Sequence, residues 1–297
     1  ETGPVFYDSY VPSGKYDPLK HQIVMFNAIA RLTRAAIIAD PGTCKTGAYL
    51  WGIDYRIKHG DIKKCLVITL SHLKKNVLAE MSIQVPELRG IVLGDKKQAS
   101  AIINKTYKVA KKNQDYDVYM ANYESMFSLV DVIPDGYFDM VIADEAHRIG
   151  SPRSRQTKKI VDKFENTKYK YVVTGTLNAN NAMSFFMPFR FMGPDMMREA
   201  NFYEFRSRHF LAVDPDQHIW VPTGSTYSHV QELIGNASVC FKKEDCLDLP
   251  DKVYQEYVCD MSKDQNVEYL RVLEDMMFIL KEGCASCEKN GAKCDWV

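Results

Sequence analysis

The chain has 297 residues, of which 46% are hydrophobic, so it can bury a large core. Its 38 Lys and Arg residues balance 38 Asp and Glu residues, so net charge alone indicates neither a nucleic acid nor a membrane partner. No apolar run approaches the ~20 residues that span a bilayer, and the first residues lack the features of a secretory signal. Most of the eight cysteines are scattered without a disulfide pattern, which favours a reducing compartment. We therefore expect a cytoplasmic protein without a membrane partner.

Helical and strand-like segments alternate along the first 176 residues. Asp17 and Pro18 form a typical helix start, and apolar residues at helical spacing continue to about Leu32. Short apolar runs typical of buried strands then alternate with helical stretches. This order predicts an α/β fold with a parallel sheet and helices on both faces. The expected strands are 35–40, 65–70, 90–95, 117–122, 138–144 and 169–176, and the further expected helices are 45–57, 71–81, 96–112 and 155–164.

Beyond about Pro194 the pattern loosens, and a second part is expected to begin near residue 248. Charge and proline interrupt residues 248–251, which is typical of a linker. A new strand is expected over 253–261, followed by a long amphipathic helix over 264–280. We therefore predict one domain over 1–247 and a separate part over 248–297.

The segment ADPGTCKTG, residues 39–47, has the composition of a phosphate-binding loop. It follows an expected strand and precedes an expected helix, so backbone N–H groups and the helix N-terminus can surround phosphates. Lys45 would reach the terminal phosphates of a nucleotide, and the Thr46 hydroxyl would bind a magnesium ion. A GxxKT sequence is often a chance match, but this position between strand and helix favours a site for ATP and Mg²⁺.

Asp144 and Glu145 lie at the end of the strand expected over 138–144. In open α/β sheets ligands bind at the carboxyl ends of the strands, so this pair suggests a metal and an activated water. Asp144 would hold the magnesium ion through water, and Glu145 would orient or deprotonate the attacking water. The alternative is a solvated turn after a strand.

Six motifs in order make the chain resemble the first RecA-like lobe of a superfamily-two helicase, a P-loop NTPase lobe, nearest the Swi/Snf-type ATPases. The segment LPDKVYQEYVCDMSKDQNVEYLRVL is similar to the start of the second lobe in this group. The six similar segments are YDPLKHQ with its adenine-reading glutamine, ADPGTCKT as motif I, VITLSHLKKNVLAEM as motif Ia, VYMANYESM as motif Ib, DEAHRIGSPRSRQTKKI as the DEAH-box motif II and YVVTGTLNANNAMSFF as motif III.

The resemblance implies roles for individual residues around the nucleotide. Gln22 would read adenine, and His147 would bridge the ATP site and motif III. Together with Lys45, the residues that would surround the phosphates are Gly42, Thr43 and Cys44.

By the same resemblance, duplex or branched DNA would cross a surface carrying motifs Ia and Ib. The expected contact residues are Ser71, His72, Asn122 and Tyr123. Each has an alternative structural role, because Ser71 and Asn122 are also good helix caps and Tyr123 could belong to the core. The residues expected to relay the nucleotide state to the DNA are Thr174, Gly175 and Thr176.

The chain departs from the pattern of this family in three respects. Motif I usually has glycine where Cys44 stands, so a positive φ at this residue would be strained. Leu70 and Leu177 replace prolines of motifs Ia and III. Nothing resembles motifs V and VI of the second lobe, whose arginines complete the ATP site, so we expect a part of a longer protein that needs that lobe for activity.

These features predict an ATP-dependent DNA helicase or translocase that acts in replication, recombination or remodelling. Two alternatives stay open, namely the motor subunit of a restriction system and a nucleotide-dependent DNA-binding module without turnover. The compactness of the chain hints at a phage or viral source, in which case the protein would act in the host cytoplasm.

Cys284, Cys287 and Cys294 form a C-x2-C-x6-C pattern. The first spacing is common in zinc sites, but a structural Zn²⁺ ion needs four ligands, so a fourth ligand would lie beyond Val297. The alternative is a reduced, solvent-exposed insertion.

Overall fold

The computed structural model describes residues 4–104, 115–175, 179–214, 219–248, 255 and 257–281. The chain divides into two compact units, Glu1–Asp248 and Leu249–Val297. The assignment of these units to a first lobe and the start of a second stays a prediction. Within the described ranges, no helix is both long and apolar enough to cross a membrane.

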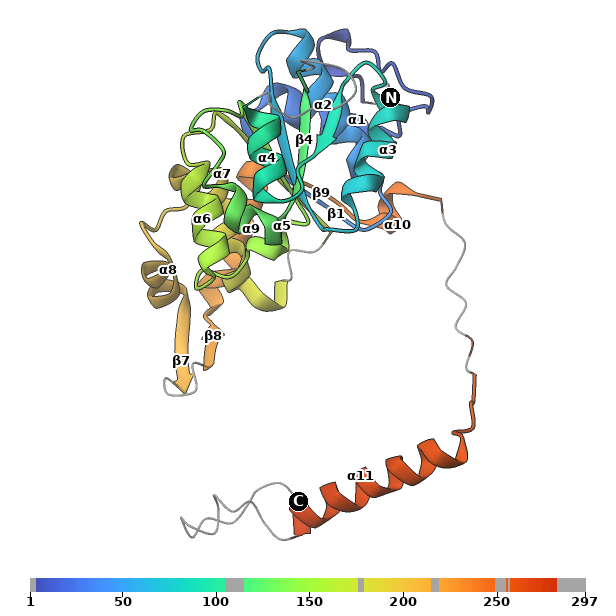
Figure 1. Cartoon of the computed structure of the whole chain (residues 1–297). Helices are drawn as coiled ribbons and strands as arrows, with labels where there is room; N and C mark the ends of the chain where they lie inside the picture. Colours follow the sequence, from blue (N-terminus) through green and yellow to red (C-terminus); the bar gives the residue numbers. More distant parts are fainter. Residues whose placement is uncertain are drawn as a thin grey trace. The chain divides into compact units, whose positions relative to one another are not determined.

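A seven-stranded parallel sheet organises the first unit (Figure 1). The strands follow the order β3-β4-β2-β5-β6-β1-β9, so segments far apart in the sequence become neighbours. The predicted α/β class with a parallel sheet is confirmed. The strands are β1 (Arg34–Ala39), β2 (Cys65–Thr69), β3 (Gly90–Val92), β4 (Val118–Asn122), β5 (Met140–Asp144), β6 (Tyr169–Thr174) and β9 (Ser238–Phe241).

Two hydrophobic cores lie on opposite faces of this sheet. Side chains of a strand alternate between its faces, and in β1 Ile37 joins one core whereas Ala36 joins the other. One core is covered by α1 (Lys20–Arg31), α2 (Lys45–Lys58) and α3 (Lys74–Gln84). The other is covered by α4 (Lys96–Ile103), α5 (Tyr123–Leu129), α6 (Arg155–Lys163), α7 (Phe186–Met192) and α9 (Gly224–Ala237). The prediction of helices on both faces is therefore confirmed.

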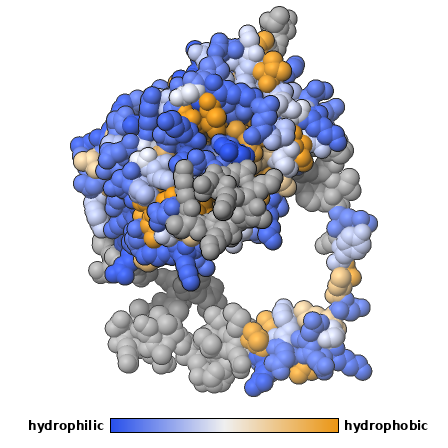
Figure 2. Space-filling model, turned by 45° about the horizontal axis from the view of Figure 1, so that its top comes forward, coloured by the Kyte–Doolittle hydropathy of each residue, from blue (hydrophilic) through white to orange (hydrophobic). Residues whose placement is uncertain are grey.

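The outer surface is mostly polar on the face shown in Figure 2, where apolar residues form small separate patches.

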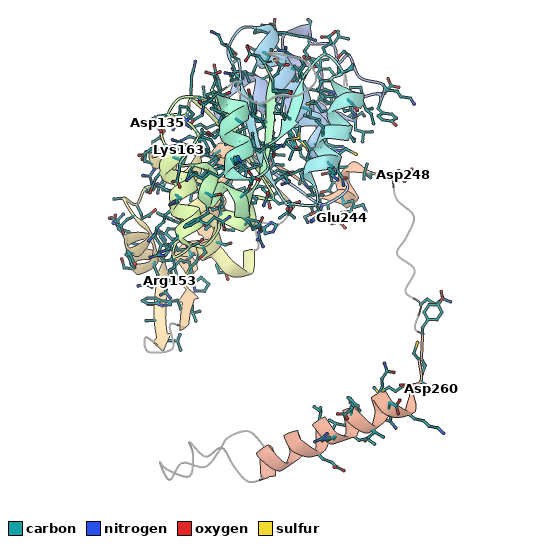
Figure 3. All side chains as sticks on the ribbon, in the orientation of Figure 1. Asp135, Arg153, Lys163, Glu244, Asp248 and Asp260 are labelled. Atoms are coloured by element: carbon teal, nitrogen blue, oxygen red, sulfur yellow. The ribbon has the colours of Figure 1, made fainter. Side chains whose placement is uncertain are left out.

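Charged pairs join neighbouring segments at the surface. Lys163 of α6 lies beside Asp135, with Nζ donating a hydrogen bond of 2.5 Å to Oδ1 (Figure 3). This pair ties α6 to the loop that leads from α5 to β5.

The first helix begins at Lys20 with Leu19 as its N-cap, two residues later than the predicted N-cap at Asp17 and first helical residue at Pro18. The Oε1 atom of Gln22 accepts a hydrogen bond of 3.0 Å from the Leu19 N–H group. This side chain satisfies the donor just before the helix and sets its start.

Other predicted boundaries also shift. The basic helix expected over 96–112 is helical to Ile103, and residues 105–114 lie outside the described ranges. The strand expected over 253–261 is wrong for its described residues, Gln255 and 257–261, which are exposed and form no strand. An extended segment becomes a strand only when another strand accepts its hydrogen bonds. The helix expected over 264–280 is present as α11 (Lys263–Lys281).

The part of the chain where the pattern loosens forms a small antiparallel hairpin between two helices (Figure 1). We call residues 197–237, apart from 215–218, the hairpin unit. Its chain continues into β9 at the edge of the large sheet and then into the short helix α10 (Lys243–Cys246). The hairpin unit contains α8 (Phe202–His209), β7 (Phe210–Asp214), β8 (Ile219–Pro222) and α9.

Candidate active site

The expected phosphate loop connects β1 to α2. Lys45 is the first residue of α2, and its buried ammonium group donates hydrogen bonds of 2.7 Å to the Ala39 carbonyl and 3.2 Å to the Asp40 carbonyl. Burial lowers the pKa of Lys45, and the negative charges of Glu145 and Asp144 oppose this shift. The ammonium group therefore lies within the electric field of both expected catalytic acids.

Cys44 adopts the left-handed conformation, with φ of 57° and ψ of 37°. Gly42 also has a positive φ, of 88°. A side chain in the left-handed region costs about 1–2 kcal/mol relative to glycine. The strain expected at Cys44 is thus present, and the chain accommodates it with the thiol exposed.

Two side chains of α1 and a main-chain group of α10 hold the loop from both sides. Gln22 Nε2 donates a hydrogen bond of 3.0 Å to the Cys44 carbonyl, and His21 Nε2 lies 3.0 Å from the Thr43 carbonyl. The Asp40 carboxylate accepts a hydrogen bond of 2.8 Å from the main-chain N–H group of Lys243. His21 and Lys243 were not expected at the site, and only the position of His21 beside Gln22 could have indicated it.

A cavity of about 580 Å³ lies beside the same loop-holding residues. Its walls come from the start of α1 and from the β9–α10 segment, and the ring of His21 faces Phe241 with centroids 5.9 Å apart. The Oε1 and Nε2 atoms of Gln22 each already form a hydrogen bond, and Nε2 has a second N–H group. Its role as an adenine reader stays a prediction. The lining residues are Pro4, Leu19, Lys20, His21, Val24, Cys240, Phe241, Asp245 and Cys246.

The expected acids end β5, which is separated from β1 only by β6. The Asp144 carboxylate is buried and accepts hydrogen bonds of 3.0 Å from the Thr69 hydroxyl and 3.1 Å from the Glu145 N–H group. Burial raises the pKa of Asp144 to about 6, whereas the hydrogen bond from Thr69 lowers it. Glu145 has a positive φ of 55°, and its Oε2 atom lies 3.3 Å from Nδ1 of the exposed His147.

The loop and the acids therefore lie at the same edge of the sheet. Thr46 lies in the first turn of α2, half-buried, where its hydroxyl oxygen and the Asp144 carboxylate are the hard oxygen donors that Mg²⁺ prefers. These residues fit the expected magnesium ion in their chemistry. The bridge from His147 to motif III stays a prediction, since the Nδ1 atom of His147 contacts Glu145.

Motif III packs directly against the phosphate loop. A Cβ atom placed on Gly175 would lie 3.0 Å from Pro41 Cδ. Thr174, at the end of β6, is buried, and its hydroxyl has no hydrogen-bond partner among the described residues. The relay role of Thr174 and Gly175 stays a prediction, and Thr176 lies outside the described residues.

The residues expected to contact DNA follow two neighbouring strands. Ser71 and His72 are exposed in the turn after β2, and Asn122 ends β4, where it pairs in register with Thr69. Asn122 accepts a hydrogen bond of 2.7 Å from the ammonium group of Lys74. Sequence reasoning missed Lys74, although it lies only two residues after His72 in the basic start of α3.

Tyr123 is the expected DNA contact that the structure contradicts. Its side chain is 1% exposed, and its hydroxyl donates a hydrogen bond of 2.7 Å to the Asp144 carbonyl. The first turn of α5 directs this ring into the core, where the polar hydroxyl finds a main-chain acceptor. The expected zinc ligands Cys284, Cys287 and Cys294 lie outside the described residues, so zinc at that place stays a prediction.

Comparison with known proteins supports the arrangement described above. The archaeal SWI2/SNF2 ATPase core of Sulfolobus solfataricus, solved in complex with dsDNA, superposes with a TM-score of 0.65 at 19% identity and covers 96% of this chain and 56% of that chain. A second structure, the SWI2/SNF2 ATPase core domain of the same organism, superposes with a TM-score of 0.60 at 20% identity and covers 89% of this chain and 52% of that chain. The expected RecA-like fold is therefore confirmed.

Two relatives in sequence extend the comparison. Protein p41 of Acyrthosiphon pisum secondary endosymbiont phage 1 is 21% identical over 292 residues, which are 94% of this chain and 62% of p41. The human DNA repair and recombination protein RAD54B is 24% identical over 177 residues, which are 57% of this chain and 18% of RAD54B. The chain thus spans less than two thirds of the length of these relatives.

The profile of one protein family, the SNF2-related domain, matches residues 21–293. This range includes the phosphate loop, the acids at the end of β5 and both motifs expected to face DNA. The resemblance to the first lobe of Swi/Snf-type superfamily-two proteins is confirmed, and the chain belongs to the SNF2-related domain family.

Proposed function

We propose that this chain is the ATP-binding half of a DNA-dependent ATPase that translocates along duplex DNA. One observation carries the proposal. The loop with Lys45 follows β1 and the acids Asp144 and Glu145 end β5, so they lie at the same edge of the sheet although about a hundred positions separate them in the sequence. A cation and two acids at one edge of a parallel sheet are the groups that phosphoryl transfer to water requires.

Each residue would take one role in hydrolysis. On nucleotide binding, the Lys45 ammonium group would exchange the carbonyls of Ala39 and Asp40 for the terminal phosphates. A bound Mg²⁺ ion would neutralise charge on the phosphates and would be held by Thr46 and Asp144. Glu145 would take a proton from the attacking water, and its contact with His147 would keep its carboxylate oriented.

The nucleotide base would enter the cavity beside α1. The cavity is lined by His21, whose Nε2 atom lies 3.0 Å from the Thr43 carbonyl of the loop, and an adenine ring would stack near Phe241. Gln22 does not line this cavity, so its second Nε2–H group would have to turn towards the base to distinguish adenine. Asp40 and Lys243 would keep the α10 wall of this cavity fixed to the loop.

The DNA would lie across the turns that follow β2 and β4. These turns carry two exposed residues, Ser71 and His72, and two half-buried residues, Lys74 and Asn122. Together they present a cation and several hydrogen-bond donors to a phosphate backbone. The complex of the related archaeal core with dsDNA supports duplex DNA as the partner. The same surface would also bind branched DNA, and the same motor activity would serve strand separation.

Efficient turnover would need residues that other members of this family carry outside the matched part. In phosphoryl transfer an arginine that approaches the transferred phosphate is worth ~1,000-fold or more in rate. The matched relatives are longer than this chain. We therefore expect the 297 residues alone to bind nucleotide weakly and to hydrolyse it hardly at all.

The test compares ATPase rates with and without duplex DNA, for the 297-residue chain and for a version extended past Val297. In the extended protein, Lys45→Ala and Glu145→Gln should each lower DNA-stimulated turnover by ~100-fold or more. Lys96→Ala and Glu87→Gln are the matched controls, since both side chains are exposed and form ion pairs with exposed partners. DNA binding without any turnover in the extended protein would favour a nucleotide-dependent binding module, and normal turnover of Glu145→Gln would refute the assignment.

A further inference from the structure

One carboxylate and two imidazoles come together inside the hairpin unit. Glu199 lies just before α8, His209 is the last residue of α8, and His229 lies in α9, so three separate segments supply the cluster. One potential metal ligand atom from each residue lies within 4.8 Å of the other two. Across the described ranges, this is the only cluster of His, Cys, Asp or Glu residues that meets this criterion.

Both imidazoles direct a nitrogen towards the same carboxylate. His209 Nε2 donates a hydrogen bond of 2.8 Å to Glu199 Oε1, with a proton that a bound metal ion would replace, and His229 Nε2 lies 3.5 Å from Glu199 Oε2. The two rings are parallel, with centroids 4.4 Å apart and an angle of 4° between their planes. Ligand atoms in a tetrahedral zinc site with bonds of about 2.0 Å are separated by about 3.3 Å. The two nitrogen–oxygen distances, 2.8 Å for His209 and 3.5 Å for His229, lie below and above this ligand–ligand distance.

The cluster is buried and incompletely paired. The side chain of Glu199 is 2% exposed and that of His229 is 6% exposed, and the fully buried ring of Phe205 lies against both imidazoles. Glu199 Oε2 and His229 Nε2 have no hydrogen-bond partner among the described residues. A buried carboxylate destabilises a protein unless a cation or sufficient hydrogen bonds compensate for its lost solvation. A metal cation at this position would satisfy both atoms and neutralise the carboxylate.

The main chain holds the cluster in place independently of any ion. The His209 carbonyl accepts hydrogen bonds of 2.9 Å from the Thr223 N–H group and 3.1 Å from the Thr223 hydroxyl. Thr223 directly precedes α9, the helix that carries His229. The two imidazoles are therefore positioned by contacts between α9 and the end of α8, as a binding site requires.

We propose that Glu199, His209 and His229 bind one divalent transition-metal ion, with Zn²⁺ as the best match. Two imidazoles and a carboxylate suit Zn²⁺, whereas Mg²⁺ and Ca²⁺ prefer oxygen ligands alone. A water molecule would fill the fourth coordination position, as at other zinc sites with three protein ligands, and the burial of these ligands indicates that the ion serves the stability of the fold. The ion stabilises the hairpin unit by joining the segment before α8, the end of α8 and α9. This site is separate from the ATP chemistry and does not depend on it.

The first experiment measures metal binding to the full 297-residue chain in which Cys284, Cys287 and Cys294 are replaced by serine. This background removes the other expected zinc ligands. Titration with Co²⁺ should give the visible absorption of a tetrahedral ion at one equivalent, without the near-ultraviolet band of thiolate ligation, and Zn²⁺ should displace it. Binding of less than about a tenth of an equivalent would overturn the proposal.

The second experiment tests the ligands. Glu199→Gln and His229→Gln keep the approximate volume of each side chain and should each abolish Co²⁺ binding, whereas the exposed His59→Gln should bind normally. If the first two variants fail to fold, thermal unfolding of the parent chain, with serine at positions 284, 287 and 294, still decides the question. A hundredfold excess of Zn²⁺ over its Kd should raise the Tm by about 5 °C or more, and Mg²⁺ should not. An unchanged Tm with Zn²⁺ would contradict the proposal.

Discussion

The hydroxyl of Tyr123 donates a hydrogen bond of 2.7 Å to the main-chain oxygen of Asp144. Tyr123 follows β4 and Asp144 ends β5, and β2 lies between these two strands in the sheet. The bond therefore spans the end of β2, the strand that leads to Ser71 and His72. It connects the segment expected to face DNA with the strand that carries the expected magnesium ligand.

Replacement of Tyr123 by phenylalanine should lower stability without changing a DNA contact. The substitution removes a donor from a buried acceptor, which typically lowers the free energy of unfolding by about 1–3 kcal/mol. Urea unfolding measures this change, and Tyr16→Phe is the control because Tyr16 is exposed. The DNA affinity at a fixed salt concentration should stay the same. A several-fold loss of DNA affinity with an unchanged free energy of unfolding would instead place the Tyr123 hydroxyl on the DNA.

Replacement of Cys44 should separate backbone strain from nucleotide recognition. Cys44→Gly removes the strain of the left-handed conformation and should keep or improve ATP affinity. Cys44→Val should lower both stability and ATP affinity, because a β-branched side chain is strongly disfavoured at positive φ. Nucleotide titration and urea unfolding of both variants measure the effects. A large loss of ATP affinity in the glycine variant would show that the thiol itself contributes to binding.

The contact between Gly175 and Pro41 should not tolerate a methyl group. In Gly175→Ala the new Cβ would lie 3.0 Å from Pro41 Cδ, so the loop or the end of β6 must shift. Such overpacking typically lowers the free energy of unfolding by about 1–3 kcal/mol, and we expect weaker ATP binding as well. Gly235→Ala is the matched control, since nothing lies within 4 Å of its Cβ position in α9. Equal nucleotide affinity in both variants would argue against coupling through this contact.

The raised pKa of Asp144 predicts a stability difference that depends on pH. Burial raises this pKa from 3.8 to about 6. Below about pH 4 the carboxyl is protonated in both the folded and unfolded states, so the shift has no effect. Above about pH 6 it is ionised in both states, and its burial lowers the free energy of unfolding by about 3 kcal/mol. Asp144→Asn should therefore gain stability relative to the wild type as the pH rises from 4 to 6.

Urea unfolding without magnesium, at several pH values, measures this difference. Glu124→Gln provides a control of opposite sign, because the hydrogen bond from Asn122 lowers the pKa of Glu124. The stabilisation that Glu124 provides is present above its unfolded pKa and is lost as the pH falls through its folded pKa. That variant should be less stable than the wild type near pH 7. A pH-independent effect of Asp144→Asn would show that its carboxyl is not perturbed in the folded protein.

Local patterns were sufficient to predict the parallel sheet and the position of the phosphate loop. The apolar runs of β1 and β5 are short and bounded by polar residues, so their strand character could be read from neighbouring residues alone. Lys45 follows the first run after a five-residue loop, Asp144 and Glu145 stand at the end of the second, and the carboxyl ends of parallel strands lie at one edge. The placement of these three residues at one edge of the sheet therefore follows from the order of strands and helices along the chain.

Contacts between distant residues decided what local patterns could not. Sequence spacing could not determine whether Tyr123 lies at the surface or in the core, and the distant carbonyl of Asp144 satisfies its hydroxyl. The start of α1 depends on the side chain of Gln22, which also reaches the loop at Cys44.

The same limit applies to the hairpin unit. His209 and His229 are twenty residues apart in sequence without any recognisable spacing, and the packing of α9 against the end of α8 stacks their rings above one carboxylate. Periodicity reports only the environment along one helix or strand. The partners of a side chain are set by which elements pack together, and that arrangement exists only in the folded chain.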